Sequence, residues 1–176
     1  SAARAAVDTV LAGSEPFPAL AVDRHWNVVS TNKAAAGLLV GVDADLLERP
    51  NALRLALHPR AIGPRIVNYA EWRAHILAVL RQQIDASADP ALEALMTELA
   101  AYPAPEHARA QKAPLHDAPG IVVPLRLRVE GGVLSFMSVI TVFGTPVDVT
   151  LSELAIETFF PADAATAAAL RARADS

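Results

Sequence analysis

Apolar and polar residues alternate with a period of two near the start of the chain. Leu20 and Val22 alternate with smaller neighbours, and residues 23–25 supply a polar reversal. The alternation then resumes over Trp26–Ser30, which predicts two short strands joined by a tight turn. Trp26 is expected in the second of these strands, either as an anchor of the core or as the wall of a ligand pocket.

A second alternation covers residues 123–129, where every odd position is Val or Leu. The pair Gly131-Gly132 predicts a two-residue hairpin turn into a strand over Val133–Phe143. With both glycines in the turn, the facing pairs are Val129 with Leu134, Leu127 with Phe136, and Val123 with Ile140. The opposite face of the second strand is also apolar, with Met137, Val139 and Phe143. Two apolar faces indicate a central strand or a face that is covered by another helix or subunit. An extended segment over Val149–Phe160 is expected to complete a sheet of about five antiparallel strands.

Helical periodicity and capping residues predict the remaining elements. The longest helix is expected over Tyr69–Asp85, because its apolar residues recur every three or four positions. Proline and polar residues without period predict an irregular loop over residues 103–119. The other expected helices are Ala2–Leu11, Lys33–Leu39 capped by Asn32, Ala52–Leu57 capped by Asn51, a helix from Pro90 to about Tyr102 capped by Asp89, and Ala164–Ala174 capped by Asp163.

Composition narrows the class of protein. The 176 residues suit one domain, and 53% of them are hydrophobic against 19% charged, so surplus apolar surface must be buried in the core, in a dimer interface or around a lipophilic ligand. The formal charge of -4, without a cluster of Lys or Arg, argues against DNA binding by this segment. The absence of cysteine excludes disulfides and fits a cytoplasmic location. No run of about 20 apolar residues and no secretion signal occur, so no membrane partner is expected.

Motifs for catalysis and metal binding are missing from the sequence. There is no HExxH, no GxSxG and no phosphate-binding glycine loop, so we expect neither an enzyme nor a cofactor. A zinc site built from His58, His75 and either His107 or His116 has no supporting spacing, and no metal is expected.

Polar residues that are candidates to bind a ligand lie in or beside two predicted helices. An arginine that points inward can hold a ligand carboxylate, and a histidine can add a hydrogen bond. The alternative is that the arginines are solvated and the histidines bond to the backbone. These residues are Arg54, His58, Arg65, Asn68, Trp72 and His75. Apolar walls for the same ligand, each of which can equally be core, are Trp26, Leu53, Leu57, Trp72, Ile76, Leu127, Phe136 and Ile140.

Four segments together resemble a known family. They are ALAVDRHWNVVSTNKAA, NALRLALHP, IVNYAEWRAHILAVLRQQ and LSFMSVITVFGTPVDVTLSELAIETFFPAD. In this order they resemble the MmyB-like ligand-binding domain that follows an Xre-type helix-turn-helix in bacterial transcription regulators. The resemblance implies a PAS-like α+β fold, a homodimer, and a pocket for a fatty acid or another lipophilic molecule.

The resemblance also implies a domain organisation. Residues 1–16 are expected to form a linker helix, residues 17–176 the ligand-binding and dimerisation domain, and the DNA-binding domain is expected upstream of Ser1. The leading hypothesis is an effector-binding domain; the rivals are a ligand-free dimerisation module and a small-molecule enzyme. The expected ligand-binding residues are Trp26, Arg54, His58, Arg65, Trp72, His75, Leu127 and Phe136.

Overall fold

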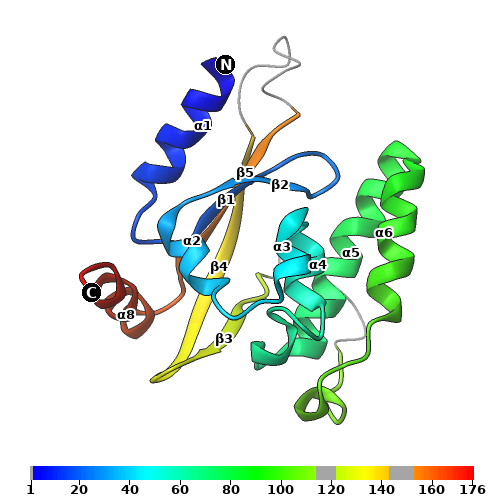
Figure 1. The fold of residues 1–176 in the computed structure, drawn as a ribbon. Coiled ribbons are helices and arrows are strands. Elements are labelled where there is room, and N and C mark those ends of the chain that lie inside the picture. The colour runs from blue at the N-terminus through cyan, green and yellow to red at the C-terminus, as the bar shows by residue number, and fades with distance from the viewer. Residues whose placement is uncertain (1, 114–121, 143–152) are drawn as a thin grey trace.

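A five-stranded antiparallel sheet forms the centre of the computed structural model, which describes residues 2–113, 122–142 and 153–176. The strand order β2-β1-β5-β4-β3 places the last strand of the chain beside the first (Figure 1). The predicted α+β class with about five strands is therefore confirmed. The strands are β1 (Ala19–Val22), β2 (Val28–Thr31), β3 (Leu125–Val129), β4 (Gly132–Val142) and β5 (Ala155–Pro161).

Helices cover both faces of this sheet (Figure 1). On one face, called the outer face here, α1 (Ala2–Gly13) packs against β1. The C-terminal helix α8 (Ala164–Ala174) contacts β4 and β5, and its Leu170 packs with the core cluster of the opposite face. The other, inner face lies under a helical layer that contains the paired long helices α5 (Tyr69–Ser87) and α6 (Pro90–Ala101). The remaining helical segments are α2 (Lys33–Leu38), α3 (Ala44–Glu48), α4 (Ala52–Leu57) and the 3-10 turns η1 (Gly63–Arg65) and η2 (Glu106–Ala108).

Side-chain caps fix where four of these helices begin. The Asn51 carboxamide oxygen accepts from the backbone N–H groups of Leu53 and Arg54, both at 3.1 Å. Such a bond satisfies donors that have no partner within the helix, and it stops the helix from extending backwards. The predicted caps Asn32, Asn51, Asp89 and Asp163 are all confirmed.

The predicted register of the β3–β4 hairpin is wrong by two residues. The turn consists of Glu130 and Gly131, and Gly132 already pairs with Val129. Both glycines have positive φ angles, 93° at Gly131 and 152° at Gly132, but only the first lies in the turn. As a result Leu127 faces Leu134 and not Phe136, which faces Leu125. A shift of two residues keeps every side chain on its predicted face.

Trp26 lies in the β1–β2 turn, so its prediction as a strand residue is wrong. Its φ of 69° is left-handed, and its backbone N–H donates to the Asp23 carbonyl at 3.0 Å. The Asp23 carboxylate also accepts from the backbone N–H groups of His25 and Asn27. These bonds close a tight polar turn, so the second strand begins only at Val28.

Other boundaries differ by smaller amounts. The longest helix runs two residues past the predicted end, to Ser87, and Ala88 then adopts a left-handed φ of 51°. The irregular loop after α6 contains η2, and α3 had no counterpart in the sequence prediction. The last strand begins only at Ala155, while the earlier part of that prediction, residues 149–152, lies outside the described residues.

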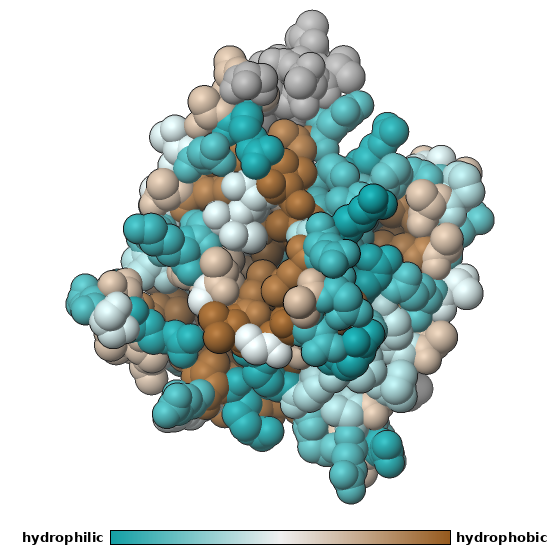
Figure 2. Space-filling model, viewed as in Figure 1, coloured by the Kyte–Doolittle hydropathy of each residue, from teal (hydrophilic) through white to brown (hydrophobic). Residues whose placement is uncertain are grey.

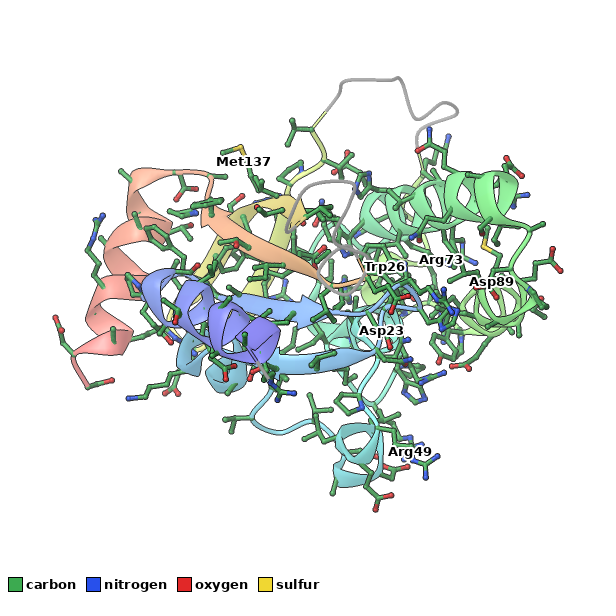
Figure 3. All side chains as sticks on the ribbon, turned by 90° about the horizontal axis from the view of Figure 1, so that it is seen from above. Asp23, Trp26, Arg49, Arg73, Asp89 and Met137 are labelled. Atoms are coloured by element: carbon green, nitrogen blue, oxygen red, sulfur yellow. The ribbon has the colours of Figure 1, made fainter. Side chains whose placement is uncertain are left out.

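Side chains of α1 cover the outer face of the sheet over strands β1 and β5. Val7 and Leu11 of α1 pack against small and branched strand residues, namely Ala19, Ala21 and Ile156. Farther along, β4 lies between β5 and β3, as a central strand should. Its outer residues Met137 and Val139 nevertheless remain 40% and 45% exposed, and Met137 points away from the α5–α6 pair in Figure 3. Phe143, the third apolar residue predicted on this face, lies outside the described residues.

Candidate ligand pocket

A cavity of about 460 Å³ separates the inner face of the sheet from the helical layer. Figure 2 shows apolar residues gathered in a hollow between the sheet and the helices α3–α6. This size falls within the range of small-molecule binding sites. The sheet lines the cavity with Leu20, Val28, Thr31, Leu125, Leu127, Phe136, Ser138, Ile140, Glu157 and Phe159. Helices and loops line it with Pro18, Trp26, Ala35, Leu38, Leu39, Ala52, Leu53, Leu55, Ala56, Ile62, Ile66, Trp72, His75, Ile76, Val79, Val122 and Val123.

Five of the eight residues expected to bind a ligand line this cavity: Trp26, Trp72, His75, Leu127 and Phe136. Alternation explains the strand residues, because Leu127 and Phe136 share the inner face, while the helical repeat brings Trp72 and His75 to one side of α5. Among the further apolar walls named from the sequence, Leu53, Ile76 and Ile140 also line the cavity, whereas Leu57 is fully buried in the core.

Arg54 is not among the lining residues and is engaged elsewhere. Its guanidinium donates two hydrogen bonds to the Glu98 carboxylate, at 2.6 and 2.9 Å, which joins α4 to α6. Tyr102 donates a third bond to the same carboxylate. The hydrogen bond from Arg54 lowers the pKa of Glu98, and burial together with Glu98 raises the pKa of Tyr102. This trio holds two helices together.

His58 and Arg65 also lie outside the cavity lining. The His58 Nδ1 accepts from the backbone N–H of Arg60 at 3.0 Å, its ring packs edge-on against Tyr102, and burial lowers its pKa. Arg65 is partly buried in η1, and this burial lowers the pKa of its guanidinium. Asn68 bridges α5 to β3, since it donates to the Pro124 carbonyl and accepts from the backbone N–H of Arg126.

The cavity wall carries few polar groups. Hydroxyls come from Thr31 and Ser138, and α5 contributes His75, whose ring lies 5.3 Å from that of Trp72. Trp72 is only 5% exposed, and its indole Nε1 has no hydrogen-bond acceptor among the described residues. A buried donor without a partner is costly, so this N–H is a candidate to bond a ligand or an enclosed water.

Glu157 is the one carboxylate among the described residues of the cavity wall, and the sequence reasoning missed it. It lies in β5 between Leu20 of β1 and Ile140 of β4, so it occupies the middle of the sheet. Burial raises the pKa of Glu157 to about 7, and a hydrogen bond with the Ser138 hydroxyl limits the rise. The available signal was alternation, because Ala155, Glu157 and Phe159 are two apart and share one face.

Histidines do not come together as a metal site in the part of the chain that the structure describes, where no group of three or more His, Cys, Asp or Glu is placed to hold an ion. His75 lies beside Trp72, and the His107 Nε2 lies 2.7 Å from the Ile66 carbonyl oxygen. His116 lies outside the described residues.

Two contacts join the β1–β2 turn to the helical layer beside the cavity. The Trp26 Nε1 donates to the Gln83 carboxamide at 2.6 Å, and the His25 Nε2 lies 2.7 Å from the Asp89 carboxylate. Figure 3 shows Trp26 between the sheet and the paired helices. The hydrogen bond with His25 lowers the pKa of Asp89. The turn, called the clasp here (residues 23–27), therefore connects the sheet to both long helices.

An α+β domain with an apolar cavity between sheet and helices, and a few polar groups in its wall, has the properties of a small-molecule binding domain. The chain matches the family model of the MmyB-like transcription regulator ligand binding domain over residues 3–172, and it belongs to that family. A search of curated proteins finds no match. No helix within the described ranges is both long and apolar enough to cross a bilayer.

Proposed function

We propose that this chain is the effector-binding and dimerisation domain of a bacterial transcription regulator and senses a lipophilic small molecule, either a fatty acid or another lipophilic compound. The observation that carries the proposal is the cavity of about 460 Å³, whose wall is predominantly apolar. Membership in a regulator ligand-binding family supports the same function. The protein acts by binding and not by catalysis, in the cytoplasm.

Burial of an alkyl chain supplies enough free energy for a sensor. Each methylene transferred from water contributes about 0.8 kcal/mol, so ten carbons supply about 8 kcal/mol before the costs of association. An association cost of about 4 kcal/mol leaves about 4 kcal/mol, which corresponds to a dissociation constant of about 1 mM, and each further methylene tightens binding about fourfold. A purely structural dimerisation module would instead be expected to fill this space with side chains.

The proposal includes a homodimer and an upstream helix-turn-helix domain through which the parent protein contacts DNA. The exposed apolar residues on the outer face of the sheet support an interface there: Val133, Met137, Val139 and Phe160 are 39–45% exposed. Ligand binding would change the packing of sheet against helices, and the clasp would carry this change along the domain. Equal ligand affinity for the operator-bound and the unbound regulator would exclude such coupling.

Mass spectrometry tests the proposal directly. The purified chain is measured under native and then denaturing conditions, and a released lipophilic compound is the expected result. If the chain is empty, calorimetric melting with ten-carbon acids, alcohols, amides and amines follows, and stabilisation by at least one of them is expected. An empty protein that none of these compounds stabilises would contradict the proposal.

Leu127→Trp tests where the ligand binds. Leu127 is 2% exposed and lines the cavity, so an indole at this position occupies ligand space at a cost of about 1–3 kcal/mol in stability. The expected result is a cooperative melt with binding lost. Met137→Trp, on the outer face of the neighbouring strand, is the control and should bind like the parent chain.

A further inference from the structure

The polar groups of the cavity wall differ in kind from those that hold a carboxylate. Proteins bind ligand carboxylates with arginine, lysine or clustered N–H donors. The described lining residues include neither Arg nor Lys, and their acidic member, Glu157, faces the cavity from the central strand β5. Arg54, which the sequence suggested for this role, is engaged by Glu98.

Two of the wall groups set complementary demands on a ligand. The Trp72 Nε1–H is a donor that lacks an acceptor among the described residues, so it is matched by an acceptor on the ligand. The Glu157 carboxyl, in an apolar surrounding, gains most from a ligand group that donates a hydrogen bond and brings no negative charge. An ionised carboxylate only accepts and an ammonium only donates, whereas a hydroxyl or a primary amide does both.

We propose that this pocket selects a lipophilic molecule with an uncharged hydroxyl or amide head group, held between Glu157 and Trp72, over the fatty acid of the same chain length. The inference rests on the proposed function, because it names the head group of the ligand of that same cavity. The pKa of Glu157, raised to about 7 by burial, supports it: near neutral pH this carboxyl is partly protonated and can donate as well as accept.

The same geometry predicts a pH dependence that is specific to the acid. Above about pH 7, an anionic head group beside Glu157 must be accompanied by a proton, so its affinity should fall about tenfold per pH unit. An alcohol needs no proton, so its affinity should stay nearly constant. The other titratable group of the described lining is His75 on α5, while Leu20, Ser138 and Ile140 face Glu157 from the neighbouring strands without adding charge.

Isothermal titration calorimetry of the ligand-stripped protein with four ten-carbon probes tests the inference. The probes are decan-1-ol, decanamide, decanoate and decylamine, each at about pH 6 and about pH 8.5. We expect the alcohol and the amide to bind at least about tenfold more tightly than decanoate at the higher pH. Tightest binding of decanoate or of decylamine at that pH would overturn the inference.

Glu157→Gln provides the decisive variant, because it keeps the volume of the side chain and removes its charge. Gln donates to a carboxylate, so the preference for the alcohol should shrink to about threefold or less and the steep fall of decanoate affinity should disappear. A pH dependence unchanged by this variant would overturn the assignment to Glu157. Glu130→Gln, in the exposed β3–β4 turn, makes the same change in net charge and should behave like the parent.

Trp72→Phe keeps an aromatic wall and removes only the Nε1 donor. It should weaken the alcohol and the amide by about threefold to tenfold and leave the pH profile of decanoate unchanged. Unchanged alcohol affinity would contradict the part assigned to Trp72. Failure of all four probes to bind the parent protein would refute this inference, and it would refute the proposed function as well if the purified chain releases no lipophilic compound. Binding with decanoate preferred refutes this inference alone.

Discussion

The two faces of the sheet use apolar residues in opposite ways. On the outer face, Ala19 and Ala21 are fully buried under α1, because alanine lets the helix approach the strands closely. On the inner face, larger residues such as Leu127 and Phe136 stand between the sheet and the helices, and a cavity remains among them. The comparison shows that a protein can pack one side of a sheet for stability and leave the other side available for a ligand.

Alanine substitution at two isoleucines of neighbouring strands should give the largest contrast. Ile156, 1% exposed on the outer face, contacts the α1 cluster, so Ile156→Ala should cost about 3–4 kcal/mol of unfolding free energy. Ile140, 46% exposed beside the cavity, should cost less than about 1 kcal/mol in the ligand-free protein. Urea denaturation measures both values, and equal losses would remove the distinction between the faces.

The pH dependence of stability should show how far the buried Glu157 carboxylate on the inner face destabilises the fold. The pKa of Glu157 is raised from its ordinary 4.5 to about 7, so between these values the folded state binds more protons than the unfolded state. The contribution of this group is fully present below about pH 4.5 and is lost as the pH rises through 7, by as much as about 3 kcal/mol. Ligand-free Glu157→Gln should therefore be more stable than the parent at pH 8, as denaturation at several pH values would show. A flat difference between the two proteins from pH 5 to pH 8 would contradict the burial of this charge.

Asn32→Ala should loosen the outer face at its edge. The Asn32 carboxamide accepts from Ala19 and Ala35 and donates to the carbonyls of Leu11 and Phe17, so it joins α1, β1 and α2. Loss of these buried bonds should cost about 2 kcal/mol. Hydrogen exchange should then show faster opening of α1, with the amides of α5 unchanged; equal acceleration in both helices would mean that the two faces unfold as one unit.

Arg54→Met should give the smallest effect. It tests whether the Arg54–Glu98–Tyr102 trio stabilises the helical layer without contacting the ligand. The ion pair is partly exposed, with side chains 31% and 39% accessible, so its loss should cost about 1 kcal/mol or less. Ligand affinity, measured by calorimetry, should change less than about twofold. A larger loss of affinity would show that Arg54 reaches the ligand after all.

Local signals predicted most of the fold. The helix Ala52–Leu57 and its cap Asn51 could be read directly, because a cap and the following apolar spacing lie within one turn of chain. The hairpin register was less determined, since two successive glycines allow more than one two-residue turn. The position of Trp26 depended on the Asp23 bonds, which no alternation pattern reveals.

The site was only partly predictable, for a different physical reason. Apolar lining residues follow from periodicity, because strand and helix geometry fix which side chains share a face. The direction of a long charged side chain depends on its partner, and Glu98 lies 44 residues beyond Arg54 in sequence. Glu157 was missed because its importance comes from the strands on either side of it, which the sequence alone does not place.

Both tryptophans of the chain, Trp26 and Trp72, line the cavity, and each is less than a tenth exposed. The indole fluorescence of the unmodified domain therefore originates wholly at the cavity wall. An alkyl chain that displaces water there should shift the emission to shorter wavelength, and the two signals can be separated with Trp72→Phe. The protein thus carries its own optical reporter of occupancy.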